Sequence, residues 1–312
     1  PSERQVYSWR NSMALTINTN TMAGNTARTL GSHYNNLSKS VQRLSSGLRV
    51  NSAADDAAGL AIRELMRSDV TTLNQGVRNA NDAISLIQTA DGALGVIDEK
   101  LIRMKELAEQ AATGTYNSTQ RLIIDSEYQA MASEITRIAN ATDFNGVKLL
   151  DGSLSGTHNG KGVSDANLNS TGELKIHFGV GNDSAEDYYY INIGSAKAAD
   201  LGVGNEAALD KAGHNISTQE NAQKALVALD EAIVSKDNIR AHLGALQNRL
   251  ENTITNLQTQ AENVQAAESR ISDVDVATEM TNFVKNQILT QSAIAMLSQA
   301  NSLPQMAMSL IG

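Results

Sequence analysis

The sequence predicts a mainly α-helical protein: a long antiparallel helical bundle or coiled coil built from both chain ends, with a small β-hairpin region in the middle. Apolar residues recur at alternating steps of three and four from about residue 30 to 141, and again from about 218 to 310. The segment between them is rich in Gly, Asn, Ser and Asp. Because an apolar stripe is unstable in water, the striped regions should pack against each other or against further copies of the chain.

The composition of the chain argues against several classes of protein. A formal net charge of -9 argues against nucleic-acid binding, and the absence of cysteine removes disulfides and thiolate metal sites. No apolar run approaches the roughly 18 residues of a membrane span. Residues 1–12 also lack the apolar core of a cleaved secretory signal. We therefore expect no membrane insertion, and an exported chain would leave the cell by another route.

The first helical pattern is a strict heptad seam. Its members are Leu30, Tyr34, Leu37, Val41, Leu44 and Leu48. The helix should end at Gly47, because glycine readily adopts the left-handed conformation of a C-terminal cap. Asn51 and Ser52 then offer an N-cap for a second helix. Asp55 and Asp56 would lie in its first turn, where the helix dipole favours negative charge.

The second helical pattern is the longest. Its apolar members are Leu73, Val77, Ala80, Ile84, Ile87, Ala90, Leu94, Ile97, Leu101, Met104 and Ala108. One extra three-residue step between Ile87 and Ala90 predicts a stammer, which overwinds a coiled coil locally. A turn at 114–118 and a resumed pattern over 124–138 predict a third helix, antiparallel to the second because the connection is short.

The middle of the chain, about 142–217, changes to the period of strands. Residues 144–150 indicate a short strand, and 174–178 and 188–193 indicate the two strands of a hairpin. The tyrosines at 188–190 have two interpretations, an exposed binding platform or ordinary strand packing. Packing is favoured, since alternation would bury Tyr189 or its neighbours.

Helical periodicity returns over 222–271, and Ser272 and Asp275 have the spacing of a capping box at the start of a last helix. That helix carries an apolar face wider than a two-helix seam requires, so we expect it to make contacts on several sides. Its apolar members are Met280, Phe283, Val284, Ile288, Leu289 and the run 294–297. Pro304 should limit it.

No arrangement of residues persuasively indicates catalysis, a metal site or a cofactor. The five histidines are scattered, and none belongs to a His-Glu-x-x-His pattern. The glycines at 202–204 lack the rest of a dinucleotide-binding loop, and those at 160–162 lack the rest of a P-loop. The sequence therefore predicts a protein that is not an enzyme and takes no cofactor.

Several segments, in order along the chain, closely resemble bacterial flagellins. They are LSSGLRVNSAADDAAGLAI (44–62), RNANDAISLIQTADGAL (78–94), TDFNGVKLL (142–150), LGALQNRLENTITNL (243–257) and ATEMTNFVKNQILTQSAIAMLSQANSLPQ (277–305). The resemblance implies an inner domain from residues 14–55 and 273–312 and an outer helical domain from 56–272, with the hairpin region at about 142–217. It implies no large variable outer domain. Residues 1–13 precede the flagellin-like part as an extension.

By this resemblance, the chain is expected to polymerise into the helical, extracellular filament of the bacterial flagellum for swimming motility. The implied partners are further copies of the chain, flagellar junction and cap proteins, and an export chaperone at the C-terminal helix. The terminal helices have narrow seams and many small or polar residues, so we expect them to order only on assembly. The alternative is a hook–filament junction protein, which shares the terminal helices.

The resemblance also implies that the flagellin-sensing Toll-like receptor of hosts recognises the outer domain. The matching positions are Arg103, Leu107, Gln110 and Glu127. The chain departs from the common pattern at Ile102 and Glu109, where a polar and an aliphatic residue are usual. The other interpretation of these positions is subunit packing. For self-assembly, the predicted seam residues are Leu37, Val41, Leu44, Leu48, Val284, Ile288 and Leu297.

Overall fold

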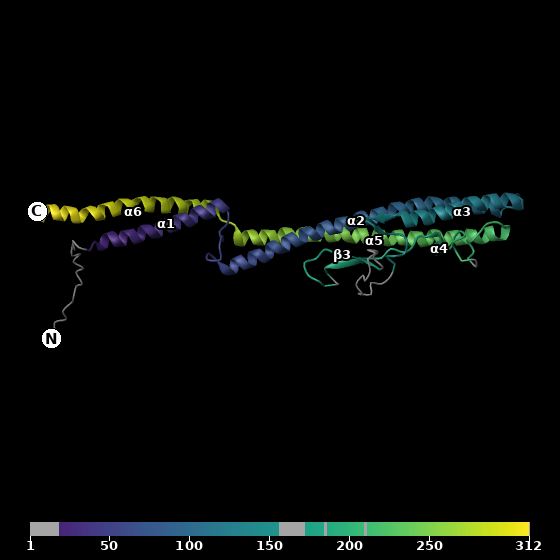
Figure 1. Ribbon diagram of the computed structural model, residues 1–312, viewed down its shortest axis with the longest axis horizontal. Helices are drawn as coiled ribbons and strands as arrows, with labels where there is room; N and C mark the ends of the chain where they lie inside the picture. Colours follow the sequence, from purple (N-terminus) through teal and green to yellow (C-terminus); the bar gives the residue numbers. More distant parts are fainter. Residues whose placement is uncertain (1–18, 156–171, 184–185, 209–210, 312) are drawn as a thin grey trace, which may run out of the picture. The chain divides into compact units, whose positions relative to one another are not determined.

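The computed structural model describes residues 19–155, 172–183, 186–208 and 211–311. The predicted N-terminal extension, residues 1–13, lies outside this described part. The elements in chain order are α1 (Thr21–Ser46), α2 (Ala57–Ala112), α3 (Ser118–Ala141), β1 (Asp143–Phe144), β2 (Val147–Lys148), β3 (Leu174–His177), β4 (Tyr188–Ile191), α4 (Ala198–Leu201), α5 (Gln219–Ser272) and α6 (Val276–Ile311) (Figure 1).

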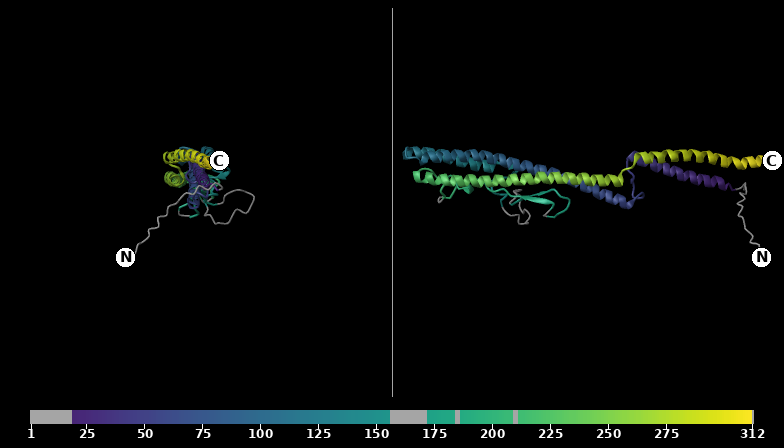
Figure 2. Two further views of the ribbon diagram at one scale, coloured as in Figure 1. Left: turned by 90° about the vertical axis from the view of Figure 1, so that its left-hand side faces the viewer. Right: turned by 180° about the vertical axis from the view of Figure 1, so that it is seen from behind.

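The predicted fold class is confirmed. The chain forms two compact units: residues 1–67 with 266–312, and residues 68–265. In the first unit α1 and α6, from opposite ends of the sequence, run side by side (Figure 2). In the second, α2, α3 and α5 enclose the main hydrophobic core, and β3 pairs with β4 in a small antiparallel hairpin.

Helix α1 has well-defined ends. The side chain of Asn20 caps its first turn by accepting a hydrogen bond from the Ala23 amide (2.9 Å). Gly47 ends it with a φ of 72°, and its amide donates to the Arg43 carbonyl, as predicted. The chain after Gly47 pairs briefly with the chain before α6, where the Arg49 amide donates to the Ser272 carbonyl (2.6 Å).

The cap of α2 differs from the prediction. The carboxylate of Asp56 accepts from the Gly59 amide (2.9 Å), so Asp56 is the N-cap and the helix begins after it. Asp55 closes the preceding turn, accepting from the Asn51 and Ser52 amides (3.4 and 3.2 Å). An aspartate side chain can either cap a helix or close a turn, so the sequence alone did not identify which residue caps α2.

The predicted stammer in α2 is wrong. The buried positions repeat at steps of three and four without interruption from Leu73 to Ala111, through Gly76 and Ala83 in place of Val77 and Ile84. Gly76 takes a core position because the hairpin backbone fills the space beside it. A Cβ added there would lie 1.9 Å from the Phe178 carbonyl oxygen.

In the second unit, α2 runs antiparallel to both α3 and α5. Asn117 begins α3 with a capping box, exchanging hydrogen bonds with Gln120. The Arg121 guanidinium then donates to the Ala111 carbonyl (2.9 Å), which holds the start of α3 against the end of α2. Tyr128 is fully buried and donates to the Gly213 carbonyl (2.7 Å), which ties the loop before α5 to α3.

The middle region contains two hairpins. The short β1–β2 hairpin turns at Asn145 and Gly146, both with positive φ (51° and 81°), as a two-residue Asn-Gly turn requires. In the β3–β4 hairpin, Tyr189 faces the helices and packs on Phe178 with ring centroids 4.7 Å apart. Tyr188 and Tyr190 lie on the opposite face of the strand. The packing interpretation therefore holds for the central tyrosine.

Helix α6 departs from the sequence prediction at both ends. Asp275 is its N-cap, accepting from the Ala277 and Thr278 amides (3.0 and 3.3 Å), whereas Ser272 is the last residue of α5. The helix also continues through Pro304. Proline has no N–H to give the carbonyl four residues earlier. That carbonyl, of Ala300, instead accepts from the Asn20 side-chain amide (2.7 Å).

Candidate assembly and recognition surfaces

The seam between α1 and α6 is poor in large apolar residues. The less exposed positions of each helix repeat at steps of three and four, which identifies the sides that face each other. These positions are Ala23, Thr26, Leu30, His33, Leu37, Ser40, Arg43 and Leu44 on α1, and Glu279, Phe283, Asn286, Leu289, Thr290, Ala293, Leu297 and Ala300 on α6. Small and polar side chains outnumber large apolar ones here, so this seam buries little apolar area.

The outward sides of the same two helices also carry large apolar side chains, most of them on α6. These side chains are between 44% and 65% exposed. They are Met22, Tyr34 and Val41 on α1, and Val276, Met280, Val284, Ile288, Ile294, Met296 and Met306 on α6. On α6, a shallow hollow is lined by Met280, Val284 and Ile288 together with the stem of Lys285. Such a contiguous apolar surface is typical of a protein–protein contact.

The seven residues predicted as assembly seams therefore divide between two surfaces. Leu37, Leu44 and Leu297 lie half-buried at seam positions between α1 and α6. Val41, Val284 and Ile288 point outward and are exposed. Leu48 lies in the link after α1, where it forms an isolated bridge with Asp273.

The seam also holds an ion pair, which the spacing of apolar residues does not predict. Arg43 lies 3.7 Å from Glu279, whose side chain is almost fully buried. Glu279 occupies a seam position in the first turn of α6, where the helix dipole favours a carboxylate. The sequence spacing was consistent with this position, because Glu279 lies four residues before the seam residue Phe283.

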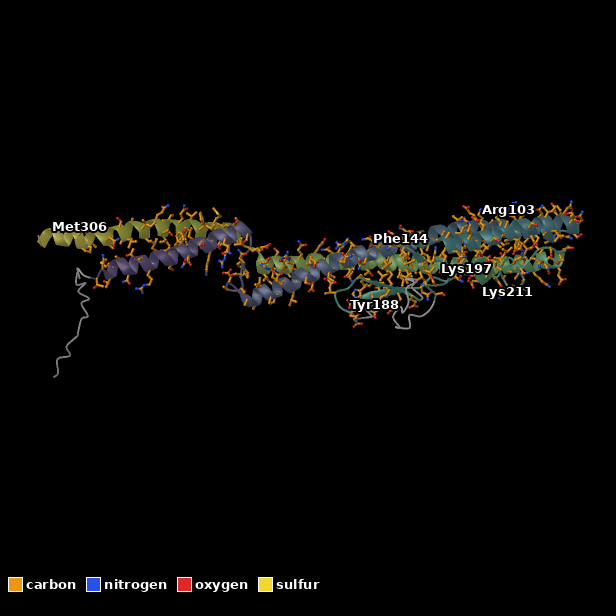
Figure 3. All side chains as sticks on the ribbon, in the orientation of Figure 1. Arg103, Phe144, Tyr188, Lys197, Lys211 and Met306 are labelled. Atoms are coloured by element: carbon orange, nitrogen blue, oxygen red, sulfur yellow. The ribbon has the colours of Figure 1, made fainter. Side chains whose placement is uncertain are left out.

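The residues expected at a receptor surface lie on α2 and α3. Figure 3 labels one of them, Arg103. The Arg103 guanidinium, 49% exposed, donates to Glu127 across the two helices (2.8 Å) and to Glu106 along α2 (2.8 Å). The hydrogen bonds that Arg103 donates to these carboxylates, mainly the one to Glu127, raise its pKa. Gln110 donates to the Tyr116 hydroxyl (3.0 Å) at the end of α2. The result is an exposed, ordered patch of charged and amide groups.

Leu107 does not belong to this patch. Its side chain is 1% exposed and lies in the core of the second unit, whereas Arg103 and Glu127 are at the surface. Leu107 lies one helical turn after Arg103, but Leu107 points into the core whereas Arg103 points to the surface. In this conformation a partner that touches Arg103, Gln110 and Glu127 does not reach Leu107.

Groups of His, Cys, Asp and Glu that could hold a metal ion do not occur among the described residues. Within the same residues, no helix combines the length and apolar character needed to cross a membrane.

The exposed apolar sides of α1 and α6 lie on the parts of the chain that match two family models. The bacterial flagellin N-terminal helical region matches residues 17–155, and the bacterial flagellin C-terminal helical region matches residues 226–311. The chain is 43% identical to the flagellar filament 33 kDa core protein of Treponema phagedenis, over 95% of this chain and 99% of the relative. The chain belongs to the bacterial flagellin family. The flagellin of Bacillus subtilis is 42% identical over the same shares of each chain.

Membership of the flagellin family establishes the general role. The chain is a structural subunit of the extracellular flagellar filament, and the family is one of structural proteins, not enzymes. A solved structure of a proposed flagellar hook-associated protein from Vibrio parahaemolyticus shares the fold (TM-score 0.53), covering 70% of this chain and all of that one. It is only 14% identical. Nothing here favours the junction-protein alternative, because the full-length relatives at about 40% identity are filament proteins and flagellins.

Proposed function

We propose that the outward apolar sides of α1 and α6 are the surface through which this flagellin subunit joins other copies. The supporting observation is the row of exposed large apolar side chains on α6, beside a seam that holds several polar residues. Val284, Ile288 and Met280 are exposed, whereas Ser40, Asn286 and Thr290 lie in the seam. In this proposal residues 14–55 and 273–312 form the inner core of the filament. Residues 56–272 form its outer helical domain.

A charge placed on the outward side tests this assembly surface. Ile288→Lys would put an ammonium group into the proposed contact, so we expect salt-induced polymerisation to fail, with no filaments in electron micrographs. Asn282→Lys is the matched control, because it adds the same charge to another exposed side of α6. Normal filaments from Ile288→Lys would exclude the surface. The same assay tests the junction-protein alternative, for which no long filaments are expected from the unmodified chain.

The proposal for recognition by the flagellin-sensing Toll-like receptor rests on the patch of Arg103, Gln110 and Glu127. Its support is the exposed ion pair between Arg103 and Glu127, which presents a fixed, charged surface across two helices. Arg103→Ala should weaken the response of receptor-reporter cells. Arg78→Ala, also an exposed arginine of α2, should leave it intact. An equal response to both variants would discard the assignment.

The proposal extends to an export chaperone and to flagellar junction and cap proteins as partners. An exported chain needs protection for the exposed apolar side of α6, and an export chaperone would supply it there. Junction and cap proteins would meet the two ends of the filament. Co-purification of the chaperone with the unmodified chain, but not with Ile288→Lys, is the expected result. Equal co-purification would place the chaperone elsewhere.

A further inference from the structure

Three ion pairs join α2 to α5 at intervals of one heptad along α2. They are Asp91–Arg240 (2.7 Å), Asp98–Lys236 (2.5 Å) and Lys105–Asp230 (2.5 Å). Because their α2 members are seven residues apart, the pairs lie along one side of the contact. In the first two pairs the carboxylate belongs to α2. In the third pair the polarity is reversed, and Lys105 supplies the ammonium group from α2.

Lys236 differs from the other five residues because it occupies the seam itself. The positions of α5 that face the core repeat at steps of three and four through it, with the half-buried Ile239 between Lys236 and Leu243. The fully buried ones in this series are Ala222, Ala225, Leu229, Ala232, Lys236, Leu243, Leu246 and Leu250. Lys236 is 1% exposed, and its ammonium group contacts Asp98 and, at 2.7 Å, Asp237. A buried ammonium group is strongly destabilised when its carboxylate partner is removed.

The apolar seam alone does not determine how α2 and α5 align. A regular heptad seam repeats itself every seven residues. A slip of one heptad, roughly 10.5 Å along the helix, therefore again places apolar residues against apolar residues. The two helices are distant in sequence, and α5 is linked to α2 only through α3 and the loop that Tyr128 ties to α3.

We propose that the reversed Lys105–Asp230 pair, acting with the buried Lys236, specifies the register of α2 against α5. A slip of one heptad in one direction brings Asp98 beside Asp230. A slip in the other direction brings Lys105 beside Lys236 and leaves Asp237 as the carboxylate that both lysines must share. Each slipped register therefore juxtaposes like charges that the native register keeps apart.

The polarity pattern matters more than the strength of any one pair. Lys105 and Asp230 are both exposed, so their attraction contributes little to stability by itself. Three pairs of identical polarity would be equally well matched after a slip. One reversed pair makes the native register different from its neighbours, which is the role that charges flanking coiled-coil seams perform. This role is separate from polymerisation, because all the residues lie within one unit of one chain.

A double charge swap separates this proposal from simple pair attraction. Lys105→Asp combined with Asp230→Lys keeps an attractive pair in the native register, but gives all three pairs the same polarity. Both slipped registers then become attractive: Asp98 meets a lysine in one, and Lys236 meets an aspartate in the other. The control swap, Asp91→Arg with Arg240→Asp, changes as many charges and leaves a polarity reversal in place.

The register can be measured by pulsed electron paramagnetic resonance on the full chain. Spin labels are attached at Val96→Cys and Val227→Cys, two exposed positions on α2 and α5 in a chain that has no other cysteine. After refolding, the unmodified charges and the control swap should give one distance. The Lys105/Asp230 swap should add distances displaced by up to about 10 Å. One unchanged distance in all three would overturn the proposal. So would failure of that swap alone to refold, since its native pair remains complementary.

Discussion

The two helical units bury different kinds of side chain. In the bundle of α2, α3 and α5, the seam positions of α2 such as Leu94, Ile97 and Leu101 are completely buried, and Lys236 of α5 is a charged residue buried in the same seam. In the α1–α6 pair, the seam mixes half-buried leucines with His33, Ser40, Asn286 and Thr290, and further large apolar residues point outward. The bundle is therefore complete as a single chain. In the proposed assembly, the pair reaches a comparable burial when other copies cover its outward sides.

The largest expected effect is the contrast between two leucines. Leu94→Ala should lower the free energy of unfolding of the bundle by about 2–5 kcal/mol, because it leaves a cavity in a fully packed core. Leu37→Ala in the pair seam should cost the single chain roughly 1 kcal/mol or less, because that side chain is only half-buried. Urea unfolding followed by circular dichroism compares the two. Equal losses would mean that both units are equally well packed.

A smaller effect should come from the buried hydroxyl that ties α3 to the loop before α5. Tyr128→Phe removes the hydrogen bond to the Gly213 carbonyl, which should cost about 1 kcal/mol. The carbonyl keeps a second donor, the Gly204 amide, so no acceptor is stranded. Tyr34→Phe, on the exposed side of α1, should leave the same unfolding curve unchanged. A shift from Tyr34 as large as that from Tyr128 would contradict the difference in burial.

Asn20 should matter about as much, but only for the α1–α6 pair. Asn20→Ala removes both the cap of α1 and the partner of the Ala300 carbonyl that Pro304 leaves unpaired. A loss of about 1 kcal/mol corresponds to a critical concentration for polymerisation raised roughly fivefold. Sedimentation of filaments at several protein concentrations measures this value. Asn25→Ala, on the exposed side of α1, should not change it.

The smallest expected effect is the pH dependence of the Asp275 cap at the start of α6. Hydrogen bonds from Thr278 and from the Thr278 and Ala277 amides hold the pKa of Asp275 below its ordinary value. Its contribution to the start of α6 is therefore fully present above about pH 4 and is lost as the pH falls through the lowered pKa. Asp275→Asn should weaken filaments slightly at neutral pH and flatten the dependence of their stability on acid. Turbidity between about pH 3 and 7 measures it, and identical acid curves would contradict the cap.

The sequence predicted the elements better than their contacts. Periodicity located the long helices and the hairpin, because apolar spacing is set by burial on one side. It misassigned the seam of α2 at Val77 and Ile84, since the true positions hold Gly76 and Ala83 and carry little apolar signal. It missed Lys236, although the gap in the apolar series between Ile233 and Leu243 marked the place where a lysine occupies the core.

The outward and inward sides of α1 and α6 were also indistinguishable from sequence. Leu37 and Val41 belong to one heptad pattern, yet the first lies at a seam position and the second is exposed. The apolar face of each helix is wider than one contact, so the position of the partner helix determines which part of it is buried. The predicted end of α6 at Pro304 was wrong for a similar reason. Asn20, far away in sequence, donates to the Ala300 carbonyl that the proline leaves without a donor.

Hydrogen exchange followed by mass spectrometry, on dilute single chains and on filaments, tests the central claim most directly. Peptides from α2, α3 and α5 within residues 68–265 should be protected in both states, because their core is complete in one chain. Peptides from α1 and α6 should exchange rapidly in the single chain and become strongly protected in the filament. Strong protection of α1 and α6 in the dilute single chain would contradict the account.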